Sequence, residues 1–303
     1  MRFADVRRAT TPYLFVLPAL GLFGTFTIYA FVLLLTTSFL GWDGIYPHNP
    51  FLSFETFRQV FVGAQNYVEV FMDDPVFWRS FRQDGLVTLL ALTFQNALAL
   101  LLAIAVNRRL RGVGAYRTIY FIPPILSEIV VGLVWSWIYD GNYGLFNQLL
   151  DAMGLEGLTR DWLSDPDTAL NALAVIHMWK GFGWGFVIFL AGLQTIPEEL
   201  YEAARMDGAS PWHRFWHITL PLLWPVCIVV SVLTILGTMQ IFALIVATTQ
   251  GGPGYHTEVP ITRIFASMLG SSRFGYACAQ GIVFGLILLV VSLVQLRFQR
   301  RVA

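Results

Sequence analysis

The sequence predicts an all-α, polytopic membrane protein with six membrane-spanning helices and with both termini in the cytoplasm. Three observations support this prediction. Of the 303 residues, 56% are hydrophobic and 13% are charged, whereas about a quarter of residues are charged in an average soluble domain. Six apolar stretches are long enough to cross a bilayer, which takes about 20 residues. Arginines gather in alternate connections between these stretches, as they do in cytoplasmic loops.

The first span is expected at residues 13–40, after a cytoplasmic N-terminal segment at residues 1–12. The basic residues of this segment are Arg2, Arg7 and Arg8. The span exceeds the apolar core of a cleaved signal peptide, which has about 7–15 residues. Residues 41–84 contain aromatic and acidic side chains and are expected to form an external loop with short helical pieces. The second span is expected at residues 85–106.

The connection that follows is predicted to be cytoplasmic because it is rich in arginine. Its arginines are Arg108, Arg109, Arg111 and Arg117. The third span is expected at residues 118–139, where Pro123 and Pro124 should bend or interrupt the helix. Residues 140–168 are expected outside, and the fourth span at residues 169–193. Glycines in the fourth span would let another helix or a solute approach its backbone; they are Gly181, Gly183 and Gly185.

A polar interruption at residues 194–221 is predicted to form two short cytoplasmic helices. Its start and stop signals are Pro197, Glu198 and Glu199 for the first helix, Gly208 for its end, and Ser210–Pro211 for the second helix. The fifth span is expected at residues 222–247, followed by an external turn rich in glycine and proline and a short helix at residues 261–269. The sixth span is expected at residues 276–296.

The basic residues agree with this topology. Twelve of them lie in segments assigned to the cytoplasm and six in external segments, while Lys180 lies within the fourth span. Residues 13–303 are therefore interpreted as a single transmembrane domain.

Several other classes of function are excluded or disfavoured. The formal net charge is zero, which argues against an extended nucleic-acid-binding surface. Cys227 and Cys278 lie in apolar segments without His or Cys at metal-ligand spacing, so we expect neither a disulfide nor a metal site. Lys180 is the only lysine and is followed by glycine, whereas a phosphate-binding GxxxxGK loop needs Ser or Thr after its lysine. If the protein uses ATP, another subunit must bind it.

The polar interruption resembles the EAA loop, EAA-x3-G-x9-I-x-LP, of permease subunits in bacterial ATP-binding-cassette (ABC) importers. All positions of the motif match: Glu202, Ala203, Ala204, Gly208, Ile218, Leu220 and Pro221. The resemblance implies a type I ABC importer permease fold in which this loop docks into an ATPase subunit. We expect Glu202 to make polar contacts, Ala203 and Ala204 to permit close docking, and Gly208 to set the turn.

Further segments resemble the carbohydrate branch of these permeases, which is related to the maltose and glycerol-3-phosphate permeases. They are Phe61-Val62-Gly63 with Asn66-Tyr67, Asp74-Pro75-Val76-Phe77-Trp78, Arg117 to Pro123 with Trp135, and Gln250 to Gly254 with Thr257-Glu258. The last of these is similar to the larger-type partner of the permease pair. One departure is Arg82-Gln83-Asp84, where the branch often has Arg-Asn-Thr.

By this resemblance the chain is a non-enzymatic, multi-pass permease of the bacterial cytoplasmic (inner) membrane that moves a sugar by alternating access. The implied partners are a second six-span permease, two cytoplasmic ABC ATPases that bind ATP and Mg, and an extracytoplasmic solute-binding protein. No cofactor is expected in this chain. Ionisable or polar residues inside spans are costly and mark candidate solute paths; we select Glu128, Trp135, Lys180, Trp184 and Gln240.

Alternative readings stay open. Glycerol-3-phosphate or another polyol could be the solute, although few basic residues lie in the spans. The tryptophans could belong to interfacial belts, and Asn96 and Gln240 could bond across helices. A polytopic membrane enzyme is the main rival, and His213 and His217 are spaced for one metal. An ion channel is disfavoured because no repeated filter-like segment or acidic ring is evident.

Overall fold

A computed structural model describes residues 15–45, 50–51, 53–107 and 112–302, of which residues 298–302 are described by their backbone alone. The predicted N-terminal segment 1–12 and the arginines at positions 108, 109 and 111 lie outside the described residues. In the described part the chain forms no β-strand, only one antiparallel bridge between Leu40 and Phe61. The predicted all-α fold is confirmed.

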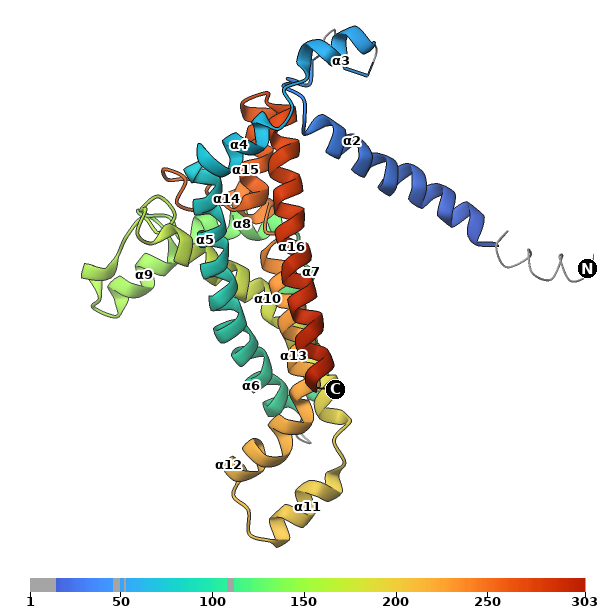
Figure 1. Cartoon of the computed structure of the whole chain (residues 1–303). Helices are drawn as coiled ribbons and strands as arrows, with labels where there is room; N and C mark the ends of the chain where they lie inside the picture. Colours follow the sequence, from blue (N-terminus) through green and yellow to red (C-terminus); the bar gives the residue numbers. More distant parts are fainter. Residues whose placement is uncertain (1–14, 46–49, 52, 108–111, 303) are drawn as a thin grey trace, which may run out of the picture. The chain divides into compact units, whose positions relative to one another are not determined.

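Most of the described chain is helical (Figure 1). The α-helices are α2 (Tyr29–Thr37), α3 (Phe54–Val60), α4 (Gln65–Met72), α5 (Pro75–Leu90), α6 (Asn96–Val106), α7 (Val113–Ile125), α8 (Glu128–Ile138), α9 (Leu145–Ala152), α10 (Ala169–Gln194), α11 (Glu198–Met206), α12 (Pro211–Arg214), α13 (Leu220–Thr238), α14 (Ala243–Thr248), α15 (Pro260–Phe265) and α16 (Phe274–Val302). Short π-helical or 3₁₀ turns are η1 (Gly24–Ile28), η2 (Ala91–Gln95), η3 (Glu156–Leu158), η4 (Phe215–Thr219) and η5 (Ala266–Gly270).

Among the residues that the structure describes, five helices are long and apolar enough to cross a membrane. They run over Phe15–Thr37, Pro75–Val106, Ala169–Gln194, Pro211–Thr238 and Phe274–Arg297. The pair Val113–Ile125 and Glu128–Ile138 passes the same test together but is bent by 95° at its break. The number of spans is six, as predicted, when this bent pair is counted as one broken span.

Three predicted boundaries differ from the structure. The second span was expected to begin at residue 85, but its helix begins at Pro75 and includes polar residues that looked like loop. The third span was expected to begin at residue 118, but its helix begins at Val113; the expected interruption is confirmed, since the chain is extended at Leu126 and turns sharply there. The fifth span was expected to reach residue 247, but its helix ends at Thr238 and a separate helix, α14, follows.

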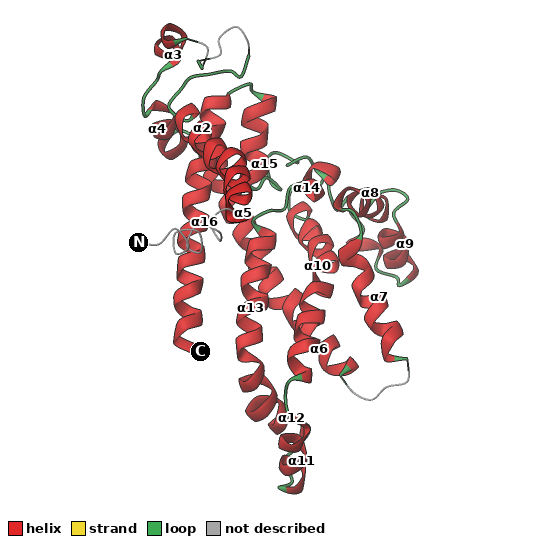
Figure 2. Cartoon of the chain, turned by 90° about the vertical axis from the view of Figure 1, so that its right-hand side faces the viewer, coloured by secondary structure: helices red, strands yellow, loops and turns green. Residues whose placement is uncertain are grey.

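The chain divides into two compact units, Met1–Asp74 with Ile264–Leu288, and Pro75–Arg263 with Leu289–Ala303. In the second unit α10 is the central element, since it packs against α5, α6, α7, α8 and α13 (Figure 2). Half of the apolar window of α10 is buried, far more than a helix surrounded by lipid would show.

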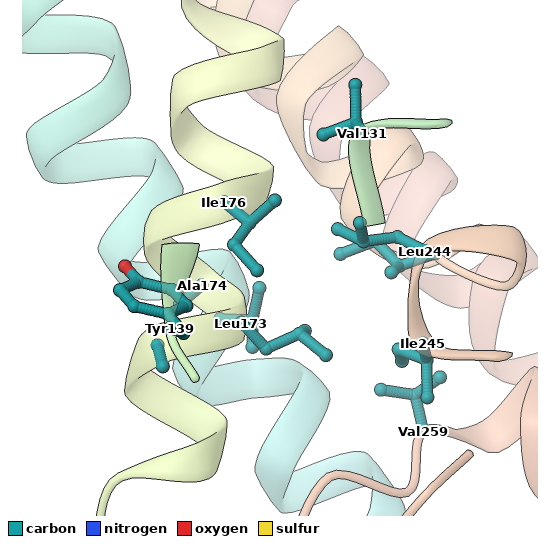
Figure 3. Packing of buried hydrophobic residues seen from close by; sticks show 11 residues of the cluster. Val131, Tyr139, Leu173, Ala174, Ile176, Leu244, Ile245 and Val259 are labelled. Atoms are coloured by element: carbon teal, nitrogen blue, oxygen red, sulfur yellow. The ribbon is translucent and has the colours of Figure 1, made fainter. Parts of the chain in front are cut away.

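Two apolar cores lie on either half of α10. One contains Leu173 and Ile176 of α10 with Leu244 and Ile245 of α14 (Figure 3). The other contains Phe186 and Phe189 of α10 with residues of α6 and α13. These cores hold the helices that surround the candidate solute cavity described below.

A proline and a glycine bring α7 and α10 close together. Pro124 has no backbone N–H, so the carbonyl of Tyr120 loses its usual partner within α7. A Cβ atom built on Gly183 would lie 2.4 Å from this carbonyl oxygen and 2.6 Å from Cγ of Pro124. The Gly183 backbone therefore occupies the space beside the interrupted turn, which no larger residue could do without moving the helices.

In the first unit a polar network ties the segment after the first span to the start of α16. Asn66 donates to the carbonyls of Ser38 and Leu40, at 2.9 Å each. Tyr276 and Gln280 both donate to the buried carboxylate of Asp74, at 2.7 and 3.1 Å. Glu69 accepts hydrogen bonds from Arg273 and raises the pKa of that guanidinium.

Candidate functional site

The segment predicted to be a two-helix platform is a hairpin formed by α11 and α12 at one end of the helical bundle (Figure 1). The helix α11 has Glu198 and Glu199 in its first turn and Arg205 in its last, which complements the helix dipole. It ends at Gly208, whose φ of +76° is left-handed. The amide of Ala209 donates to the Ala204 carbonyl at 2.8 Å, which completes a Schellman cap.

The second arm of the hairpin is continuous with a membrane span. The Ser210 hydroxyl accepts a hydrogen bond from the His213 amide at 3.2 Å, and Pro211 occupies the first turn. From Pro211 the chain is helical as far as Thr238. A hydrogen bond of 3.0 Å between the hydroxyls of Tyr201 and Thr219 joins the two arms. The turn between α11 and α13 is thus braced by a hydrogen bond between its two arms.

The structure shows which motif residues are available to a partner. Glu202 and Ala203 are exposed on α11, whereas Ala204 is partly buried. Glu202 lies 3.7 Å from Arg205, but both side chains are more than half exposed, so this ion pair contributes little. Ile218 and Leu220 are partly buried, and Pro221 is exposed at the start of α13.

Two exposed apolar side chains on the hairpin were not selected from the sequence. Met206 is 88% exposed and Trp212 is 70% exposed. Large exposed apolar residues beside small ones are typical of protein-binding surfaces. Both residues fall in the x3 and x9 segments of the EAA motif, where any residue is allowed, so the motif could not single them out.

His213 and His217 do not form an evident metal site. Their rings are stacked with centroids 3.9 Å apart, and Nδ1 of His217 lies 3.0 Å from the His213 carbonyl oxygen. Among the residues that the structure describes, no group of three or more His, Cys, Asp or Glu side chains could hold a metal ion. Cys227 and Cys278 are both free thiols.

A second candidate site is a cavity of 340 Å³ among the helices of the second unit. It is lined by Gln95, Glu128, His177, Lys180, Gly181, Trp184, Gly185, Ile188, Val230, Leu233, Thr234 and Gly237. Nζ of Lys180 lies 3.6 Å from Oε1 of Glu128. This volume is within the usual range for small-molecule sites, about 300–1,000 Å³. The structure therefore brings three predicted path residues, Glu128, Lys180 and Trp184, to one cavity.

The other two predicted path residues do not line this cavity. Trp135 packs against Tyr139 and Trp179, with ring centroids 5.2 and 5.6 Å away, as part of an apolar core. Gln240 lies beyond the end of α13, where its backbone amide bonds to the Gly237 carbonyl. The sequence pattern could not predict that Trp135 and Gln240 lie outside the cavity, because the direction of the Trp135 ring and the end of α13 depend on packing between helices.

Three polar residues of the cavity region were missed or only partly anticipated. Gln95 lies in a π-helical turn, and its buried Oε1 has no hydrogen-bond partner among the described residues. His177 precedes Lys180 by one turn and lines the same cavity. Thr234 lines it too and donates to Asn96 at 3.0 Å, so Asn96 does bond across helices, one of the two roles considered for it.

Comparison with known proteins gives a consistent picture. The model of the family described as "binding-protein-dependent transport system inner membrane component" matches residues 95–303. The probable ABC transporter permease protein YurN of Bacillus subtilis is 34% identical over 95% of each chain. The trehalose/maltose transport system permease protein MalF of Thermococcus litoralis is 32% identical over 97% of this chain and 95% of its own.

The fold also has a close counterpart among solved structures. A crystal structure of a bacterial alginate ABC transporter, in complex with a periplasmic protein bound to an alginate pentasaccharide, contains a similar chain. The TM-score is 0.82 with 24% sequence identity, and the match covers 99% of this chain and 97% of that one. At this identity the match establishes the fold.

Proposed function

Since the chain belongs to the family of binding-protein-dependent transport system inner membrane components, we propose that it is the membrane-spanning permease of an ATP-driven sugar importer. It is a multi-pass protein of the cell membrane and a transport subunit. The observation that carries the proposal is the hairpin of α11 and α12, which exposes Glu202 and Ala203 of the EAA motif and continues into a span.

The proposed mechanism is alternating access driven from outside the chain. A solute-binding protein delivers the solute to the external face, and two cytoplasmic ATPase subunits bind ATP and Mg and close. The exposed face of α11, with Glu202 and Ala203, receives that movement. Because α12 is continuous with α13 and Tyr201 braces the turn, the movement reaches the spans as a rigid displacement.

The solute is proposed to pass through the cavity lined by Gln95, Glu128, Lys180 and Trp184. Gln95 offers an unpartnered buried acceptor, and the half-exposed Trp184 ring offers an apolar face on which a sugar ring could stack. Lys180 is paired with Glu128, so the positive charge of its ammonium group is already neutralised. We therefore favour a neutral sugar over glycerol-3-phosphate, whose phosphate would be repelled by the Glu128 carboxylate.

The second permease is proposed to be a related six-span protein, so that the pair forms a heterodimer. The proposal follows from the resemblance of Gln250 to Gly254, with Thr257-Glu258, to the larger-type partner. ATP hydrolysis is assigned to the separate ATPase subunits.

Gly208→Val tests the proposed coupling role. A β-branched residue is strained at φ +76°, at about 1–2 kcal/mol for a left-handed L-residue, and should distort the turn that links α11 to α12. In proteoliposomes that contain the whole transporter and its binding protein, we expect ATP hydrolysis to continue while solute uptake falls at least tenfold.

Gly208→Asn is the matched control, because asparagine tolerates the left-handed region better than other L-residues. It should keep most of the uptake. Normal coupling in Gly208→Val would contradict the proposed role of the hairpin. ATP-dependent uptake of glycerol-3-phosphate in preference to neutral sugars would contradict the solute class.

A further inference from the structure

A second cavity lies inside the hairpin rather than on the face proposed to meet the ATPase. Its volume is 610 Å³. It is lined by Ile104, Asn107, Leu193, Gln194, Ile196, Glu198, Tyr201, Arg205, Pro211, Arg214, Phe215 and Thr219. These residues come from the ends of α6 and α10 and from both arms of the hairpin, so the cavity lies at the joint between the hairpin and the spans.

The lining is divided between apolar and basic groups. Ile104, Leu193, Ile196 and Phe215 supply an apolar wall that continues from the spans. Arg205 and Arg214 approach from α11 and α12, against one acidic residue, Glu198. The lining thus combines an excess of positive charge with an apolar surface, and an amphiphile with an anionic head group matches both.

Arg214 is the most informative of these residues. Its Nε atom is buried and has no hydrogen-bond partner among the described residues, although a buried guanidinium donor without an acceptor is unfavourable. Asn107 and Tyr201 add polar groups to the same cavity. A phosphate in the cavity would pair with the terminal amino groups of this guanidinium, because arginine binds phosphate oxygens through several donors at once.

We propose that this cavity binds the phosphate head group of an anionic phospholipid from the cytoplasmic leaflet. Two features favour a lipid over a free phosphate or nucleotide: the apolar wall, and the position at the ends of two membrane-spanning helices. Basic pockets between membrane helices on the cytoplasmic side bind anionic lipid head groups in other proteins. The lipid would then stiffen the joint through which the hairpin moves the spans.

The proposal rests on the cytoplasmic location of the hairpin but on no particular solute. Its test uses the complete transporter in phosphatidylcholine nanodiscs, titrated with phosphatidylglycerol that carries a fluorescent acyl chain. Binding is reported by the part of the tryptophan energy transfer that is lost in Trp212→Phe/Trp216→Phe, since these two tryptophans lie on the second arm of the hairpin. Saturable binding to the wild type is expected, and its absence overturns the proposal.

Arg214→Gln should weaken this binding about fivefold or more, as expected for loss of one basic contact with an anionic lipid surface. Arg214→Lys keeps the charge but loses the forked donors of the guanidinium, so its binding should lie between those of the wild type and Arg214→Gln, which separates a lost contact from a damaged fold. Asn107→Trp fills the cavity without changing its charge and should also reduce binding. Arg160→Gln removes an arginine from the loop that precedes α10, where it pairs with Asp165, and should leave lipid binding unchanged.

Three results would overturn the assignment. They are equal binding to the wild type and Asn107→Trp, equal loss in Arg160→Gln, and displacement of the lipid by inorganic phosphate or ATP at matched concentration. The two proposals fail in different ways. If the proposed transport function is wrong, the transporter shows no sugar uptake, but lipid binding to this chain is still observed.

Discussion

Glu128 and Lys180 show how a single pair of side chains sets the character of the proposed solute path. They come from α8 and α10, and their charged atoms lie 3.6 Å apart in a cavity between membrane-spanning helices. Each charge is expensive within a bilayer unless it has a partner. The Lys180 side chain is 17% exposed and that of Glu128 38%, so the pair is partly shielded while remaining open to the cavity.

We expect Lys180→Met to destabilise the protein by about 1–2 kcal/mol, a value between those of exposed and buried ion pairs because Glu128 is partly exposed. The double variant Glu128→Gln/Lys180→Met should recover this stability, since neither charge is then left alone. It should not recover uptake if the pair also orders the solute. Thermal unfolding in detergent and uptake in proteoliposomes measure the two effects separately.

Full recovery of uptake in the double variant would show that the pair serves folding alone. Equal instability of the single and double variants would show that the two charges do not stabilise each other.

At the scale of the element, α7 and α10 illustrate how local sequence features combine. Pro124 frees the Tyr120 carbonyl, and Gly183 lets the backbone of α10 fill the space beside it. The two helices also meet through aromatic rings: Phe186 of α10 packs edge-on against Tyr120 of α7, with ring centroids 5.4 Å apart. The interrupted turn is thus supported from the neighbouring helix.

Gly183→Val should separate these helices and destabilise the fold by about 1–3 kcal/mol, the usual range for overpacking. Gly114→Ala in α7 is the control, because no atom lies within 4 Å of its added Cβ; it should be neutral or slightly stabilising. Unfolding temperatures of the two variants provide the measurement, and a Gly183→Val protein as stable as the wild type would contradict the described packing.

Much of this architecture could be predicted from the sequence, because each signal was local. The Gly208 stop and the Ser210–Pro211 start of the hairpin are confirmed by the left-handed φ and by the capping hydrogen bond. The start of α5 at Pro75 was missed because Arg79, Arg82 and Asp84 resemble loop residues. Pro123 and Pro124 indicated an interruption, but its 95° angle depends on the helices against which α7 and α8 pack.

The candidate sites were predictable to different degrees for the same reason. The EAA residues lie in one continuous segment, so their spacing alone placed them on one hairpin. The cavity is formed by residues of η2, α8, α10 and α13, which are distant in sequence. The sequence shows one charged residue in α8 and one in α10. Only the tertiary structure shows that Glu128 meets Lys180, and that Trp135 packs elsewhere.

At the scale of the whole molecule, the orientation in the membrane links the separate proposals. The ATPase contact and the lipid cavity both require the hairpin on the cytoplasmic side. The helix α10 has 26 residues and so measures about 39 Å at 1.5 Å per residue, enough to cross the roughly 30 Å hydrocarbon core. Its two flanking segments must therefore lie on opposite sides of the membrane.

Cysteine labelling tests which side is which. Cys227 and Cys278 are first replaced by alanine, and one cysteine is then introduced as Glu156→Cys or Glu199→Cys, at exposed positions before and after α10. Because arginine-rich connections stay inside, a membrane-impermeant maleimide should label the Glu156→Cys protein in intact cells and the Glu199→Cys protein only after permeabilisation. The reverse pattern would invert the topology, and the hairpin could then meet neither a cytoplasmic ATPase nor a lipid of the inner leaflet.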